Sequence, residues 1–167
     1  FKDPWKASDE YITIFLDSVS EVRERFIRRH SLRSLGQEEQ IEAFQLLEVQ
    51  RMALYMFTSC GWFFDDISGL EPVQVLKYAA RAMELAEPWS NRDLESGLMK
   101  YLSAAGSNDP EYRDGKDVYD LQVKPDRIDP SRATAHYALS GFTDGVSRAG
   151  RLFSETVRPL SELRLTE

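Results

Sequence analysis

The sequence has one cysteine, no long apolar run and fewer basic than acidic residues, and each shortage excludes a class of protein. A single cysteine cannot form an internal disulfide, which disfavours a disulfide-stapled secreted scaffold. No apolar stretch approaches the roughly 18 residues of a membrane-spanning helix, so we predict no membrane partner. With 21 basic against 28 acidic residues we also expect no nucleic-acid partner, because that affinity rests largely on neutralising phosphates. The expected location is the cytoplasm.

The composition is that of a globular protein. The chain has 167 residues, 42% hydrophobic and 29% charged, which suits one ordinary domain and disfavours a disordered chain or a pure coiled coil. The basic residues between 23 and 29 alternate with glutamates, and we interpret them as a solvated helix face. The chain begins at Phe1 without an initiator methionine, and we expect it to be a fragment of a larger protein.

Apolar residues recur at steps of three and four along most of the chain, which predicts an all-α fold. We expect a mostly antiparallel bundle of five or six helices, with helices at about residues 8–30, 37–57, 71–87, 93–105 and 116–123 and a last one starting near 129–130. The bundle domain should cover residues 1–142. Residues 151–157 have strand character but no evident partner strand, so we expect 143–167 to be irregular, to pair with another copy or to begin a truncated following segment.

Residues 58–69 combine three aromatic side chains, two carboxylates, the cysteine and two glycines. Aromatic rings beside carboxylates are typical of carbohydrate sites, because ring faces stack on sugar C–H groups while the acids accept hydroxyl hydrogen bonds. The alternative is core packing of the rings, with Asp65 and Asp66 solvated or paired with arginines such as Arg51 or Arg81. The residues alone favour core packing.

Other chemistry has weaker support in this sequence. A Cys60 nucleophile needs a base, and His136 could reach it only through tertiary structure, whereas His30 at a helix end is expected to meet carbonyl groups. Adjacent carboxylates such as Asp65 and Asp66 point apart, and no histidine lies in a spaced ligand motif, so we predict no metal. Phosphate-binding glycine spacing is also missing. We predict no catalytic residue and no cofactor in this chain.

Polar residues occur within the strongly apolar second helix. Glu48, Gln50 and Arg51 lie among apolar neighbours there and must find partners. One interpretation is a satisfied network, joined by His136, that fixes the helix against its neighbours. The other is a ligand role, which the residues favour less.

Three stretches, residues 46–51, 56–71 and 75–82, carry a resemblance to a known group. They resemble the C-terminal helical region of bacterial and archaeal proteins related to glycoside hydrolase family 57, a region catalogued as a domain of unknown function. Shorter matching segments lie at residues 1–5, 107–108, 114–119 and 135–140, so the similarity extends to about residue 142.

The resemblance implies a preceding α/β barrel that carries the two catalytic carboxylates of retaining α-glucan chemistry, with the helical domain packed across its mouth. This chain would be inactive alone, in a parent glycoside hydrolase or glucanotransferase. Trp62 would form a wall of the sugar cleft, with Phe63 and Phe64 anchoring the segment to the second and third helices. Asp65 or Asp66 would bind sugar hydroxyls or the barrel.

Cys60 and Gly61 complete the candidate substrate-binding set. The family-57 motif commonly has an acid before its tryptophan, and Gly61 stands in that place. The alternative function is an interaction module that docks the barrel, or forms a homodimer through exposed apolar surface, and meets no sugar. An apolar patch near residues 57–67 or along the first helix would indicate a missing partner.

Overall fold

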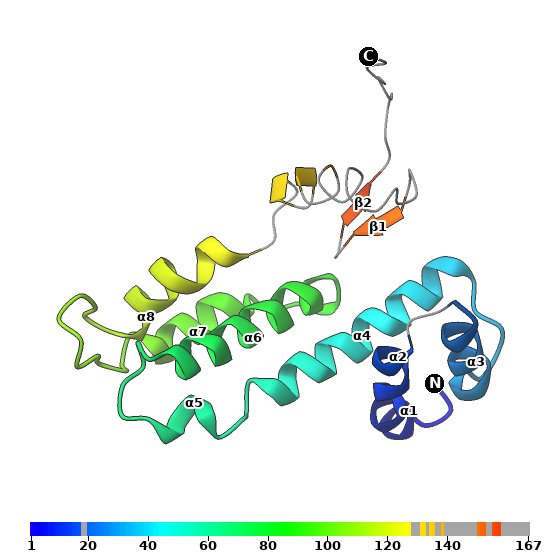
Figure 1. Cartoon of the computed structure of the whole chain (residues 1–167), viewed down its shortest axis with the longest axis horizontal. Coiled ribbons are helices and arrows are strands. Elements are labelled where there is room, and N and C mark those ends of the chain that lie inside the picture. Colours follow the sequence, from blue (N-terminus) through cyan, green and yellow to red (C-terminus); the bar gives the residue numbers. More distant parts are fainter. Residues whose placement is uncertain are drawn as a thin grey trace, which may run out of the picture. The chain divides into compact units, whose positions relative to one another are not determined.

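The computed structural model describes residues 1–17, 20–127, 131–132, 134–135, 138, 150–152 and 155–157. Figure 1 shows the helices in chain order. Contacts divide the chain into two compact units, 1–125 and 126–167. The predicted division after residue 142 falls outside the described residues and stays a prediction.

The N-terminal segment forms three helices where one was predicted: α1 (Pro4–Glu10), α2 (Ile12–Leu16) and α3 (Ser20–His30). The helical segment starts earlier than residue 8 because Asp3 caps α1, its carboxylate accepting a hydrogen bond from the Lys6 amide at 3.1 Å, and Pro4 needs no amide partner there. It breaks after α2 because Asp17 takes an extended conformation. Ile14 and Phe26 are buried as the apolar spacing predicts, but Phe15 is 46% exposed and the interruptions were not predicted.

Helix α4 (Gln37–Tyr55) runs antiparallel to α6 (Leu70–Ala86), and the two lie side by side in Figure 1. The Gln45 side-chain amide donates to the Leu85 carbonyl at 3.0 Å, while the rings of Tyr55 and Tyr78 lie 5.2 Å apart. The packing face of α6 is rich in alanine, which permits this close approach.

Short helices follow on both sides of α6. These are α5 (Cys60–Phe63), η1 (Glu87–Trp89), α7 (Leu94–Leu102), α8 (Gly115–Val118), η2 (Tyr119–Val123) and η3 (Lys124–Asp126). Asp93 caps α7 by accepting from the Ser96 amide, and Asp114 caps α8 through the amides of Lys116 and Asp117. Element η2 is a π-helix that continues α8, where the sequence predicted one short regular helix.

Buried apolar side chains form three clusters along the bundle. One joins α6, α7, α8 and η2 around the fully buried Tyr119, and a second joins α1, α2, α3 and α4 around Phe26. The third lies between α4 and α6 at Met52, Ala82 and Leu85. The prediction of an all-α helical bundle is confirmed.

The second unit contains helical residues between 131 and 138 and two short strands, β1 (Gly150–Leu152) and β2 (Glu155–Val157). The strands pair antiparallel, with Arg151 opposite Thr156. The expectation of an irregular tail is therefore wrong for these residues. Residues 155–157 find their partner strand at residues 150–152, a pairing that the local sequence pattern did not indicate.

Candidate functional site

Helix α5 and the turn before it expose four aromatic side chains, which we call the aromatic face: Phe57, Trp62, Phe63 and Phe64. Trp62 and Phe63 keep 73% and 74% of their surface accessible, Phe57 keeps 76% and Phe64 keeps 49%. The Phe63 and Phe64 rings meet edge to face at 5.3 Å. Phe63 and Phe64 therefore form an exposed ring pair, and exposed apolar groups that lie together can mark an interaction surface.

Gly61 explains why these rings point outward. A Cβ on Gly61 would lie 2.9 to 3.1 Å from three side-chain atoms of Val75, so α5 rests on α6 through its glycine. Successive residues of a helix are rotated by about 100°, which directs Phe63 almost opposite to Gly61. The predicted anchoring by Phe63 is therefore wrong, because a one-turn helix can bury only one side and Gly61 takes it. Phe64 follows α5 and is 49% exposed, and its anchoring stays a prediction.

The other predicted site residues of this segment lie beside the aromatic face. Trp62 points away from the bundle, and Cys60 and Asp65 are exposed. Within the described residues, no hydrogen bond or ion pair uses the Asp65 carboxylate. Gly61 is turned toward α6 and sets the position of the others. Cys60, Trp62 and Asp65 are each exposed, although Cys60 and Trp62 lie about 200° apart around α5.

Asp66 differs from Asp65 because internal donors occupy its carboxylate. One oxygen accepts from the Ser68 amide at 2.8 Å, the Ser68 hydroxyl at 2.6 Å and the Ser107 hydroxyl at 2.9 Å. The other accepts from the Asn108 amide. The proposed pairing of these acids with Arg51 or Arg81 is wrong for Asp66, since those arginines bind glutamates on their own helices.

The predicted polar network in α4 forms around Arg51. Its guanidinium binds both carboxylate oxygens of Glu48, with one N–O distance of 2.9 Å, and stacks 4.4 Å above the Phe15 ring. The Tyr11 hydroxyl also reaches Glu48, at 3.5 Å, and burial together with the Glu48 carboxylate raises the pKa of Tyr11 to about 12. Gln50 takes no part in these bonds, and His136 lies outside the described residues.

Arg51 should matter for stability, because its removal leaves Glu48 partly buried and Phe15 uncovered. We expect Arg51→Ala to lower the free energy of unfolding by about 1 to 2 kcal/mol, measured by urea denaturation. Arg28→Ala is the matched control, since Arg28 pairs with Glu24 on an exposed surface and should change stability by less than about 0.5 kcal/mol. Equal losses in the two variants would contradict this role for Arg51.

His30 ends α3, as the sequence predicts, but its side chain is buried. Its Nε2 lies 3.1 Å from the Glu10 carboxylate, which also binds Arg29, and its ring packs on Phe26. The prediction that His30 meets carbonyl groups is therefore wrong. It fixes α1 to α3 within the N-terminal cluster and lies on different helices from the aromatic face.

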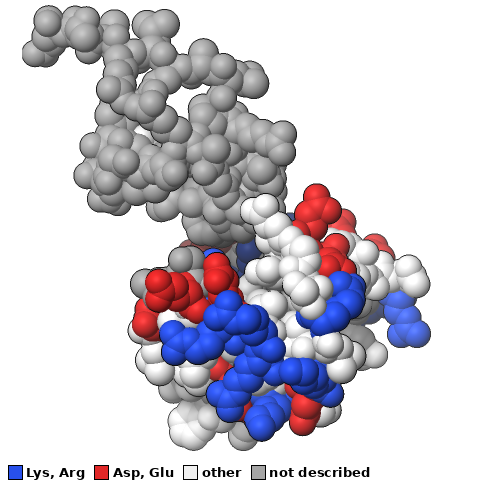
Figure 2. Space-filling view, turned by 90° about the vertical axis from the view of Figure 1, so that its right-hand side faces the viewer, with Lys and Arg blue, Asp and Glu red and all other residues white. Residues whose placement is uncertain are grey.

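Figure 2 shows basic side chains gathered on one face of the molecule. Helix α3 carries the exposed Arg23, Arg25, Arg28 and Arg29. Arg28 is paired with Glu24 and Arg29 with Glu10. This partial neutralisation fits the interpretation of a solvated helix face.

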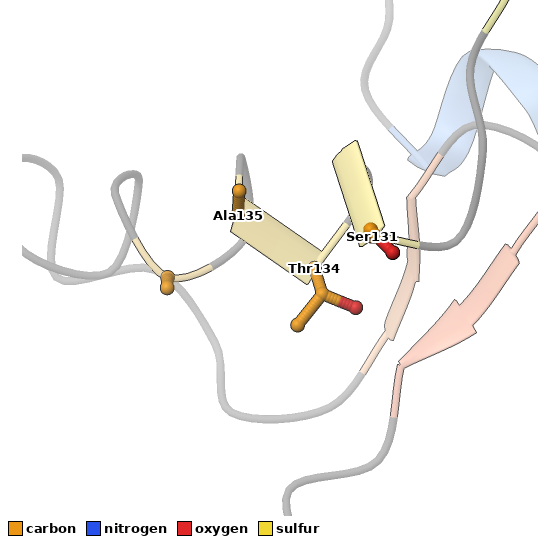
Figure 3. A pocket seen from close by; sticks show the side chains of 4 residues that line it. Ser131, Thr134 and Ala135 are labelled. Atoms are coloured by element: carbon orange, nitrogen blue, oxygen red, sulfur yellow. The ribbon is translucent and has the colours of Figure 1, made fainter.

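A cavity of about 480 Å³ in the second unit, drawn in Figure 3, is lined by Ser131, Thr134, Ala135 and Ala138. These four residues are small and uncharged, and they offer little with which to orient a ligand. Among the described residues, no cluster of histidine, cysteine and acidic side chains could hold a metal ion. None of the described helices is long and apolar enough to cross a membrane.

Sequence reasoning missed the contributions of Ser107, Asn108 and Ile67. In the sequence, residues 107–108 stand out because they resemble the known group, and Ile67 stands out only as part of the aromatic run at residues 58–69. Ile67 packs against the buried Gly115, whose added Cβ would lie 2.6 Å from the end of the isoleucine. These contacts join segments about 40 residues apart, and local patterns carry no signal for such pairs.

Comparison with known families gives one result. A family model described as a domain of unknown function (DUF3536) matches residues 1–166. No curated protein and no solved structure gives a significant match.

Proposed function

The chain belongs to the family of the domain of unknown function DUF3536, and we propose that it is a helical accessory module that packs its aromatic face against a catalytic barrel. The proposed barrel is of the glycoside hydrolase family 57 type, because residues 46–51, 56–71 and 75–82 resemble the helical region of proteins related to that family. The catalytic carboxylates belong to the barrel in this proposal, and the module contributes shape and contact surface.

One observation carries the proposal: the exposure of the aromatic face. Burying a side chain of this size contributes about 1.5 to 3 kcal/mol, so four exposed rings leave a considerable stabilisation unused. Aromatic residues are also enriched at the centres of protein interfaces. A barrel rim placed over α5 would bury these rings together. These rings lie within residues 57–67, where an apolar patch would indicate a missing partner.

The sugar contact is the more specific part of the proposal. Trp62 supplies a flat exposed ring and Asp65 a solvated carboxylate with unused acceptor oxygens, the pair of groups that stacking on a sugar and binding its hydroxyls require. An α-glucan bound at the barrel mouth would then meet Trp62. In the alternative function, the same face docks the barrel or a second copy of the chain and meets no sugar.

A pair of tryptophan variants separates the two functions. In the full-length protein, we expect Trp62→Ala to weaken maltooligosaccharide binding about tenfold and to lower α-glucan turnover, because stacking on the indole is lost. Trp5→Ala is the matched control, since Trp5 on α1 is also 73% exposed but lies outside the aromatic face. Binding is measured by isothermal titration calorimetry. Unchanged binding and turnover in Trp62→Ala would remove the sugar contact.

A further inference from the structure

Asp66 ties two distant loops together. Its carboxylate lies in the turn between α5 and α6, and it accepts hydrogen bonds from the Ser107 hydroxyl and the Asn108 amide in the loop between α7 and α8. The Asn108 side-chain amide donates in return to the Asp65 carbonyl, at 3.2 Å. We call this set of bonds the Asp66 clasp.

The loop that the clasp binds is itself fixed to the core. Gly106 pairs with Asp114 in an isolated antiparallel bridge, and the Gly115 amide donates to the Ala105 carbonyl at 2.7 Å. Ile67, next to Asp66, packs against the buried Gly115 at the start of α8. The clasp therefore connects the turn after α5 to a rigid part of the bundle.

Helix α5 depends on neighbouring structure for its orientation, because it is short and lies on the surface of the bundle. It has only four residues, its Ser59 N-cap makes no side-chain cap bond, and none of its residues is buried. It packs along α6, where Gly61 lies against the Val75 side chain. A short helix with its apolar side chains in water is unstable unless neighbouring structure orders it.

We propose that Asp66 is a positioning residue that holds α5 in the orientation that presents the aromatic face. This inference rests on the proposed function for its purpose, because a face ordered before docking loses less entropy on binding. It also separates the two acids: Asp66 is committed to internal donors, whereas Asp65 stays available to a partner. The Ser68 hydroxyl and then the Asn108 amide lower the pKa of Asp66, so the clasp is charged at neutral pH.

Cys60 offers a direct readout of this role, since it is the single cysteine of the sequence, is exposed and lies on α5. A nitroxide label on Cys60 in the full chain reports the mobility of α5 by electron paramagnetic resonance. We expect Asp66→Ala to increase the mobile fraction of the signal severalfold, and Ser107→Ala, which removes one bond of the clasp, to increase it less. The melting temperature is recorded for each variant.

Asp93→Ala is the matched control, because Asp93 is an exposed acid that caps α7 through the Ser96 amide and takes no part in the clasp. It should leave the Cys60 spectrum unchanged even where it lowers the melting temperature. If Asp66→Ala does not fold, the Ser107→Ala spectrum tests the proposal in its place. An unchanged label spectrum in the folded clasp variant overturns the proposal. The measurement involves no barrel or sugar, so a failure of the proposed function would not alter its outcome.

Discussion

Replacing Phe63 with aspartate is expected to abolish docking of the module on its barrel while leaving the module folded. Phe63 is 74% exposed on the side of α5 away from Gly61, so the change should alter the free energy of unfolding by less than about 0.5 kcal/mol. At the centre of an interface, a charge in place of a ring should cost more than about 2 kcal/mol of binding free energy. Calorimetric titration of the module with the separately produced barrel measures this loss.

Tyr101→Asp is the matched control for Phe63→Asp. Tyr101 is an 80% exposed aromatic residue, but it lies on α7, outside the aromatic face. We expect this variant to bind the barrel like the unmodified chain. Undiminished binding by Phe63→Asp, or equal losses in both variants, would contradict the assignment of the aromatic face as the docking surface.

The second large effect is expected at Gly61. An alanine there would place its Cβ 2.9 to 3.1 Å from Val75, and because the Val75 Cβ is among the crowded atoms, rotating the valine side chain gives no relief. We expect Gly61→Ala to lower the free energy of unfolding by about 1 to 3 kcal/mol or to displace α5 from α6. Urea denaturation measures the first result and the mobility of a label on Cys60 the second.

Two further variants isolate this contact. Gly97→Ala, within α7, has no atom within 4 Å of the new Cβ and should stabilise the chain by up to about 1 kcal/mol through helix propensity. In a Val75→Ala background, Gly61→Ala should lose most of its cost, since the crowded side chain is gone. Additive losses in the double variant would show that Gly61 and Val75 do not interact as the geometry requires.

The sequence predicted the long helices well because their signals are local. The apolar spacing placed helices close to the observed α4 and α6, and Pro72 near the start of α6 marked its first turn. The N-terminal helix was less predictable. The regular helix is interrupted near Tyr11 and near Asp17. The spacing of the apolar residues continues across both positions, so it gives no sign of the interruptions.

At the candidate site, the chemical character of the residues was easier to predict than the direction in which each side chain points. The mixture of rings and acids at residues 58–69 indicated a surface of mixed character, but Phe63 and Phe64 were expected to anchor the segment. Gly61 was interpreted only as the absence of an acid, because its contact with Val75 on the next helix leaves no trace in the local sequence. The different roles of Asp65 and Asp66 could not be predicted from the local sequence either, because they depend on hydrogen bonds from Ser107 and Asn108 in a distant loop.

Solvent access to Trp62 tests the central claim most directly. With Trp5, Trp89 and every tryptophan outside this chain replaced by phenylalanine, acrylamide quenching of Trp62 can be compared between this chain alone and the full-length protein. The proposed docking predicts strong quenching in the isolated chain, where Trp62 is 73% exposed, and severalfold weaker quenching when the barrel covers the aromatic face. Equal quenching in the two proteins would contradict it.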